Sequence, residues 1–130
     1  FDKNSGTLKE IQTVPTLPSG ASTAGVTCAD IHVSPNGQFL YASNRGHNSI
    51  VCYRIDQETG QLKYVGHTTA GIKRPRNFAI EPNGKFFLVA NQDADNVVVF
   101  SINPKTGKLK STGISAKVPV PVCLKFVPIS

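Results

Sequence analysis

The chain has 130 residues, and its 14 Lys and Arg against 8 Asp and Glu give a formal net charge of +6. Its three cysteines, an odd number without Cys-x-x-Cys spacing, disfavour a disulfide framework or a zinc site and indicate reduced thiols. No apolar stretch approaches membrane-spanning length, and the basic residues form neither a run nor a stacking platform. We therefore expect no membrane or nucleic-acid partner.

Residues 1–28 start in the middle of a pattern. The segment 1–8 matches 55–62, where the chain leaves one strand through a turn and enters the next. We therefore expect residues 1–28 to hold the outer strand of one repeat and the loop to the following repeat. On this interpretation three strands of that first repeat are missing, and the chain is the C-terminal portion of a longer protein.

Residues 29–75 are interpreted as a full repeat of four strands. Runs rich in β-branched and aromatic residues, bounded by Gly, Pro, Asn and Asp, predict these strands at 30–33, 39–44, 49–55 and 62–68. Between the first two strands, Pro35 fixes φ while Asn36-Gly37 tolerates positive φ, which is typical of a tight hairpin. No segment has the period and length of a helix.

Residues 76–120 repeat the pattern at a constant offset of 47 positions, as from Pro35 to Pro82. The matching strands are predicted at 77–80, 86–91, 97–102 and 109–115. Residues 121–130 begin another repeat, in which 121–127 is predicted as an inner strand that closes a ring. A strand-filled period of this size is typical of a β-propeller blade. We therefore expect an all-β fold of about two and a half blades, each of four antiparallel strands.

The topology of such blades predicts where a site lies. The connection between blades and the hairpin between the second and third strands share one face, whereas the Pro-Asn-Gly and Thr-Gly turns share the other. Residues on the second face are explained by backbone geometry. Because inner strands line the central channel, a polar funnel is expected at its mouth. Its predicted members are Asp30, Arg45, His47, Arg76 and Asn77.

Structural explanations compete with functional ones at each candidate. Asn44 and Asn91 end the same strand in both repeats, so each could serve only to satisfy loop backbone. Asp30 at the start of an inner strand could likewise accept loop N–H bonds. Cys28 lies near the mouth, but no thiolate-stabilising partner is evident in the sequence.

The basic candidates leave the same choice open. Arg45 stands where the second repeat has Gln92, so the repeat alone does not require it, and both Arg45 and Arg76 could pair with a neighbouring carboxylate. His32 could be a hydrogen-bonded core histidine or a base, and His47 could be an ordinary loop residue.

Two segments carry a family resemblance. Residues 29–46, with Ser-Asn-Arg-Gly at 43–46, and residues 75–80 continuing through 89–92 resemble the lactonase family of seven-bladed propellers. That family includes propeller-type 6-phosphogluconolactonases and carboxy-cis,cis-muconate cyclases. The resemblance covers nearly the whole chain and implies the last third of a seven-bladed ring, with the remaining blades as its structural partners.

The resemblance implies a site without metal or cofactor that hydrolyses a phosphorylated sugar lactone, a small anionic substrate. The family acid falls on Asp30, where members usually have Glu, and the family arginines fall on Arg45 and Arg76. Asp30 is the expected base or water orienter, with His32 or His47 as second choices. The arginines would bind the oxyanion or the phosphate. Expected substrate contacts are Asn44, His47, Asn77, Asn91 and Gln92.

Two other functions stay open from the sequence. One is a non-catalytic propeller that binds a ligand or a protein on the same face. The other is a carboxymuconate-type lactonising cyclase, in which the base transfers a proton at carbon. Fold alone does not separate them, because propellers support many functions. We expect a cytoplasmic location, although a chain that begins mid-pattern carries no information on export.

Overall fold

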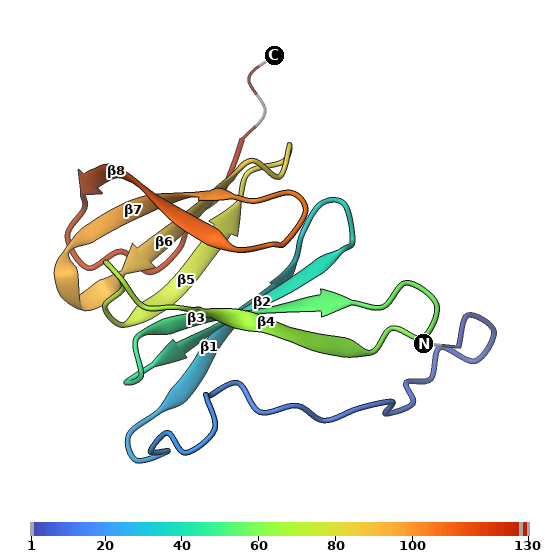
Figure 1. Cartoon of the computed structure of the whole chain (residues 1–130). Helices are drawn as coiled ribbons and strands as arrows, with labels where there is room; N and C mark the ends of the chain where they lie inside the picture. Colours follow the sequence, from blue (N-terminus) through green and yellow to red (C-terminus); the bar gives the residue numbers. More distant parts are fainter. Residues whose placement is uncertain (1, 128, 130) are drawn as a thin grey trace.

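The computed structural model describes residues 2–127 and 129, and it contains two four-stranded antiparallel sheets (Figure 1). The strands of the first sheet lie in chain order and are β1 (Thr27–Val33), β2 (Phe39–Arg45), β3 (Ser49–Ile55) and β4 (Leu62–Thr68). This arrangement confirms the prediction of an all-β fold made of four-stranded blades.

The second sheet repeats the first and lies beside it. Its strands are β5 (Pro75–Ile80), β6 (Phe86–Asn91), β7 (Asn96–Ile102) and β8 (Leu109–Lys117). A short 3-10 helix, η1 (Gln92–Ala94), lies in the β6–β7 connection. Among the described residues, no helix has the length and apolar character needed to cross a membrane.

The positions of the eight strands predicted for the two full repeats are confirmed, with shifts at some ends. β1 begins at Thr27 rather than residue 30, because Thr27 and Cys28 pair with the end of β2 before the register shifts ahead of Ile31. β5 shows the same shift between Pro75 and Asn77. Each inner strand therefore has a bulge near the face where the site is predicted. A bulge redirects the side chains beside it.

The same type of turn occurs at three places in the chain. In its first copy, the Gly6 N–H donates to the Asp2 carbonyl at 2.9 Å, and the Asp2 N–H donates to the Thr7 carbonyl at 2.9 Å. The same two bonds occur in the turns that begin at Asp56 and Asn103. The glycine of each turn has positive φ, which explains why glycine recurs at this position.

Two expected strands are absent. Residues 2–26 contain no strand where an outer strand was expected, and 121–127 contain none where an inner strand was expected. Outer and inner strands each bond to a neighbour in their own blade, and no described residue supplies that neighbour. The first segment instead lies along β4, where the Gln12 side chain bonds both the N–H and the carbonyl of Leu62, at 2.7 and 3.1 Å.

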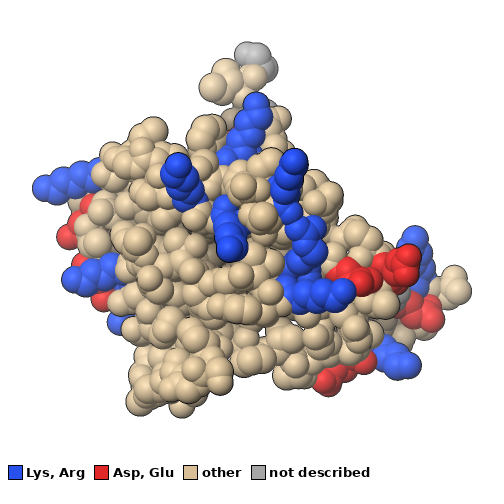
Figure 2. Space-filling view, in the orientation of Figure 1, with Lys and Arg blue, Asp and Glu red and all other residues tan. Residues whose placement is uncertain are grey.

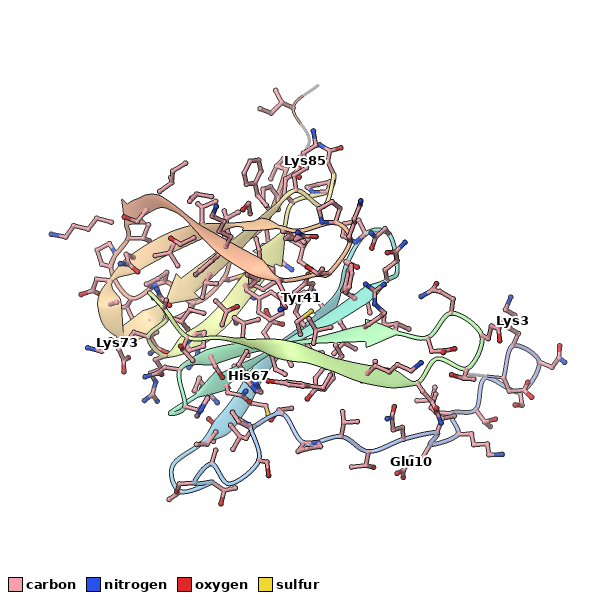
Figure 3. All side chains as sticks on the ribbon, in the orientation of Figure 1. Lys3, Glu10, Tyr41, His67, Lys73 and Lys85 are labelled. Atoms are coloured by element: carbon pink, nitrogen blue, oxygen red, sulfur yellow. The ribbon has the colours of Figure 1, made fainter. Side chains whose placement is uncertain are left out.

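The core lies between the two sheets. Phe78 on the inner strand β5 stacks on Phe87 at 4.6 Å between ring centroids, and Tyr41 of the first blade packs on Phe87 at 5.0 Å. The Tyr41 hydroxyl reaches across the seam between the two sheets and donates to the Gly107 carbonyl at 2.8 Å (Figure 3). This interdigitation is typical of close-packed interiors. It also holds the two inner strands β1 and β5 beside each other.

Candidate active site

Asp30 is placed by the bulge in β1. Its own N–H donates to the Ser43 hydroxyl of β2 at 3.0 Å instead of to a backbone carbonyl. The register therefore shifts at this residue, and its side chain reaches across the seam to the second blade. Ser43 thus takes the place of a backbone acceptor for the inner strand. The sequence did not predict this contact.

The Asp30 carboxylate accepts four N–H donors. Asn77 Nδ2 donates to its Oδ2 at 2.6 Å, and the Phe78 N–H donates to the same oxygen at 3.1 Å. The Ile31 N–H donates to Oδ1 at 3.0 Å. His32 Nε2 lies 3.1 Å from each carboxylate oxygen. Such a carboxylate is held in place from several directions, and most of its lone pairs are occupied.

His32 is the exposed member of this pair. Its side chain is 42% exposed, compared with 19% for Asp30. Its ring meets Phe78 edge-on, with 4.9 Å between centroids. Because Nε2 faces a carboxylate, the hydrogen bond favours the neutral tautomer with its proton on Nε2. Nδ1 has no hydrogen-bond partner among the described residues, so its lone pair is available.

The two expected arginines lie on the same face without joining Asp30. Arg45 Nη2 donates to the Cys28 carbonyl at 3.4 Å, while its Nε is buried without a partner among the described residues. Arg76 Nη1 donates to Gln92 Oε1 at 3.5 Å. No salt bridge within the described part of the chain links either guanidinium to a carboxylate. Their positive charges are therefore not neutralised locally.

The paired asparagines are fully buried and bond to loop backbone. Asn91 accepts from the Lys73 N–H at 2.9 Å and donates to the Gly71 carbonyl at 2.8 Å. Asn44 donates in the same way to the Thr16 carbonyl at 2.8 Å. Each side chain thus ties the incoming loop to the end of a second strand. This geometry gives both residues a structural role that accounts for their repetition.

His47 lies farther from the pair, on the β2–β3 hairpin. Its Nδ1 is 2.8 Å from the Ser49 hydroxyl, and its ring lies 5.9 Å from that of His67. His67 in turn contacts the Tyr64 hydroxyl and the Thr16 carbonyl, each at 2.9 Å. His47 and His67 therefore form a cluster beside Tyr64 of the outer strand, and among the described residues neither of them contacts Asp30.

Arg74 was not predicted. It adopts a left-handed backbone conformation, with φ of 47°, and its N–H donates to Asn48 Oδ1 of the first blade at 2.9 Å. Its guanidinium lies 3.7 Å from the Asp93 carboxylate. A non-glycine residue in this conformation is uncommon. The position 47 residues earlier is Thr27, so Arg74 is also unmatched between the repeats, and this difference is the signal that could have identified it.

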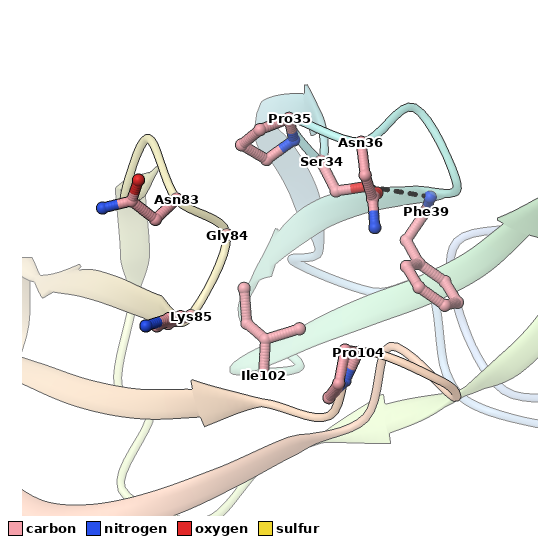
Figure 4. Close-up of a pocket in the computed structure, with 9 residues that line it drawn as sticks. All are labelled: Ser34, Pro35, Asn36, Phe39, Asn83, Gly84, Lys85, Ile102 and Pro104. Atoms are coloured by element: carbon pink, nitrogen blue, oxygen red, sulfur yellow. Dashed lines mark hydrogen bonds between the residues drawn. The ribbon is translucent and has the colours of Figure 1, made fainter.

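Two hollows are lined by candidate site residues, and a third lies on the opposite face. One of about 260 Å³ is lined by His32 and Asn77, and another of about 220 Å³ is lined by Asp30 and Cys28. A third, of about 300 Å³, lies among the turns of the opposite face (Figure 4). The third contains none of the predicted site residues. Its lining consists of Ser34, Pro35, Asn36, Phe39, Asn83, Gly84, Lys85, Ile102 and Pro104.

Charge and metal-ligand geometry complete the description. Lys and Arg side chains are spread across the face seen in Figure 2 rather than collected in one patch. Within the described residues, no group of three His, Cys, Asp or Glu is arranged to hold a metal ion. The described residues contribute a carboxylate–imidazole pair and nearby guanidinium groups to the site.

Antiparallel four-stranded sheets packed face to face, with their inner strands adjacent, define consecutive blades of a β-propeller. The family model described as "Lactonase, 7-bladed beta-propeller" matches residues 1–126. The chain belongs to this family, as its resemblance to lactonases predicted.

Named relatives agree with the family assignment. The chain is 33% identical over 127 residues to the 6-phosphogluconolactonase of Bacillus subtilis, which covers 98% of this chain and 36% of that protein. It is 56% identical over 55 residues to a 6-phosphogluconolactonase of Formosa agariphila, a match that covers 41% of this chain and 16% of that protein. The chain thus spans much less than two thirds of the length of these relatives.

A solved structure is also similar. The periplasmic gluconolactonase of Pseudomonas aeruginosa superposes with a TM-score of 0.91 at 35% identity. The match covers 99% of this chain and 36% of that structure. The two blades and their flanking segments therefore have the arrangement found in about a third of a complete propeller of this family.

Proposed function

We propose that the protein is a lactone hydrolase that opens a phosphorylated sugar lactone at the mouth of the propeller channel. The observation that carries this proposal is the Asp30–His32 pair, in which an accessible imidazole is held at 3.1 Å by a fixed carboxylate. Relatives named 6-phosphogluconolactonase support the substrate class. The remaining blades of the same protein would complete the channel wall.

The geometry favours His32 over Asp30 as the proton acceptor. Asp30 already accepts from Asn77, Phe78 and Ile31, whereas His32 Nδ1 has no partner among the described residues. In the proposed step, a water molecule gives a proton to Nδ1 while its oxygen attacks the lactone carbonyl. Asp30 orients the imidazole and stabilises the imidazolium that forms. The ring C–O bond then breaks, and the proton passes to the leaving ring oxygen.

The two arginines are proposed to bind the negative charges of the substrate and of the transition state. Arg45 and Arg76 carry forked donors suited to a phosphate group or to the oxyanion that develops at the carbonyl. Gln92 contacts Arg76 and lies with it at the rim, so it is proposed to help bind the substrate. His47 is also proposed to contact the substrate at the rim of the channel. Asn44 and Asn91 would act indirectly, because both are buried beneath the hairpins.

A substrate panel tests the proposal. The full-length protein is expected to hydrolyse 6-phosphogluconolactone faster than unphosphorylated gluconolactone, measured as acid release above the spontaneous rate. Arg76→Ala should lower kcat/KM for the phosphorylated lactone by about tenfold to a hundredfold, because a charge-assisted contact is lost. Arg54→Ala is the control, since Arg54 lies near the end of β3 that leads to the turns of the opposite face, with its guanidinium 4.8 Å from the centre of the Phe39 ring. Equal rates for wild type and Arg76→Ala would exclude the role given to Arg76.

A further inference from the structure

Similar side-chain to backbone bonds link the inner strand of each blade to the next inner segment, with the donor shifted by one residue between the two copies. Asp30 on β1 accepts the N–H of Phe78 on β5 at 3.1 Å. Asn77, which occupies the position of Asp30 one repeat later, accepts the N–H of Leu124 at 2.7 Å through Oδ1. Residues 121–127 contain no strand, yet Leu124 still makes this bond. In both places the side chain at the matched position therefore accepts a backbone N–H from the next inner segment, from Phe78 in one copy and from one residue earlier in the repeat, Leu124, in the other.

Asn77 differs from Asp30 because an amide can accept and donate at once. Its Oδ1 accepts from Leu124, while its Nδ2 donates to Asp30 Oδ2 at 2.6 Å. One side chain thus connects three inner segments that lie 47 residues apart along the chain. A carboxylate at position 77 would keep the acceptor and lose the donor. The sequence difference between the two repeats therefore has a geometric consequence.

We propose that Asn77 is a positioning residue that fixes the Asp30 carboxylate against His32, rather than a group that binds substrate. Its N–H···O contact is the shortest that Asp30 receives, and together with the Phe78 N–H it holds Oδ2 from the second blade. The carboxylate is thereby left in reach of His32 Nε2. This inference rests on the proposed catalytic role of His32.

The titratable groups around His32 determine how strongly a carboxylate introduced at position 77 would affect it. Tyr41 is its register partner on β2, and burial raises the pKa of Tyr41 above its usual value, which keeps its hydroxyl neutral. Lys125 lines the same hollow as His32 and Asn77. Asp30 is the sole carboxylate within salt-bridge distance of His32 among the described residues. A second carboxylate at this point would therefore change the local charge substantially.

The test separates the two halves of the Asn77 side chain. Asn77→Asp in the full-length protein keeps an acceptor for the Leu124 N–H but removes the donor to Asp30 and adds a negative charge. The acidic limb of kcat/KM is then expected to move to higher pH by about one unit, because nearby negative charge favours the imidazolium. Asn77→Ala should lower kcat by about tenfold with little change in KM, because the pair is no longer well oriented.

The controls distinguish positioning from simple stabilisation. Asn83→Asp makes the same charge change in an exposed turn of the opposite face and should leave the pH profile unchanged. The Asn77 assignment is wrong if Asn77→Asp reduces stability yet keeps the wild-type pH profile. It is also wrong if Asn77→Ala raises KM and leaves kcat unaltered, since that result indicates substrate binding.

A second readout does not depend on catalysis. In wild type, ¹⁵N NMR of the neutral His32 ring should find the proton on Nε2. In Asn77→Asp, the signals of the imidazolium should persist to a higher pH than in wild type. If the protein hydrolyses no lactone but these signals behave as expected, the proposed function fails and the positioning contact stands. If the signals of wild type and variant coincide at every pH, the positioning contact is refuted.

Discussion

Replacing Gly107 with Ala would force a methyl group into the ring of Phe39. An added Cβ at this position lies 2.4 Å from Phe39 Cδ1 and 2.7 Å from Cε1. The ring itself is buried and packed against the second blade, so it has little room to move. Gly107 therefore contributes to the seam between blades as well as to the local turn.

The repeat supplies two matched controls for this substitution. Gly60 and Gly6 occupy the same turn, with φ of 73° and 69° compared with 74° for Gly107. A Cβ at Gly60 meets only the end of the Ile11 side chain at 3.3 Å, and one at Gly6 meets nothing within 4 Å. All three substitutions share the backbone strain of alanine at positive φ, about 1–2 kcal/mol. Only Gly107→Ala adds overpacking, about 1–3 kcal/mol.

Chemical denaturation measures the difference directly. Gly107→Ala is expected to lower the free energy of unfolding by about 2–5 kcal/mol, and Gly60→Ala and Gly6→Ala by about 1–2 kcal/mol each. The informative quantity is the gap of about 1–3 kcal/mol between the first variant and the other two. Equal losses in all three variants would refute the claim that the Phe39 ring packs on Gly107.

Two further predictions concern the same seam. Tyr41→Phe should lower the free energy of unfolding by about 1–2 kcal/mol in chemical denaturation, because the buried Gly107 carbonyl loses its 2.8 Å hydroxyl donor; an unchanged free energy would contradict the bond. Burial raises the pKa of the Cys52 thiol to about 11, so near pH 8 a thiol reagent should modify exposed Cys28 and Cys123 while Cys52 reacts only after unfolding. The stability contributed by the neutral Cys52 thiol is present below its ordinary pKa of 9.0 and is lost as pH rises toward 11. Rapid native labelling of all three thiols would contradict this burial.

Local chemistry made the strands predictable. Pro-Asn-Gly and Thr-Gly fix the turns, and the apolar runs between them leave little freedom in strand position, so 49–55, 62–68 and 86–91 match the structure at both ends. The strands expected near the two ends are absent for a different reason. A strand requires a partner, and the segments 2–26 and 121–127 have none in their own blade among the described residues.

The site was only partly predictable because its decisive contacts cross the seam. Comparison of the repeats singled out Asp30 and His32 as unmatched residues on an inner strand. It offered no means of foreseeing that Asp30 accepts the Phe78 N–H, since that bond depends on how blades pack. The bulge in β1 and the left-handed Arg74 likewise follow from tertiary packing, which overrides local preference.

The rate of 6-phosphogluconolactone hydrolysis by His32→Ala tests the central claim most directly. Acid release would be followed at constant pH for the full-length wild type and the variant, each corrected for spontaneous opening. A positioned base contributes about a hundredfold or more, so the variant should lose at least that factor in kcat while remaining folded. A wild-type rate in the folded His32→Ala variant would contradict the assignment of His32 as the proton acceptor.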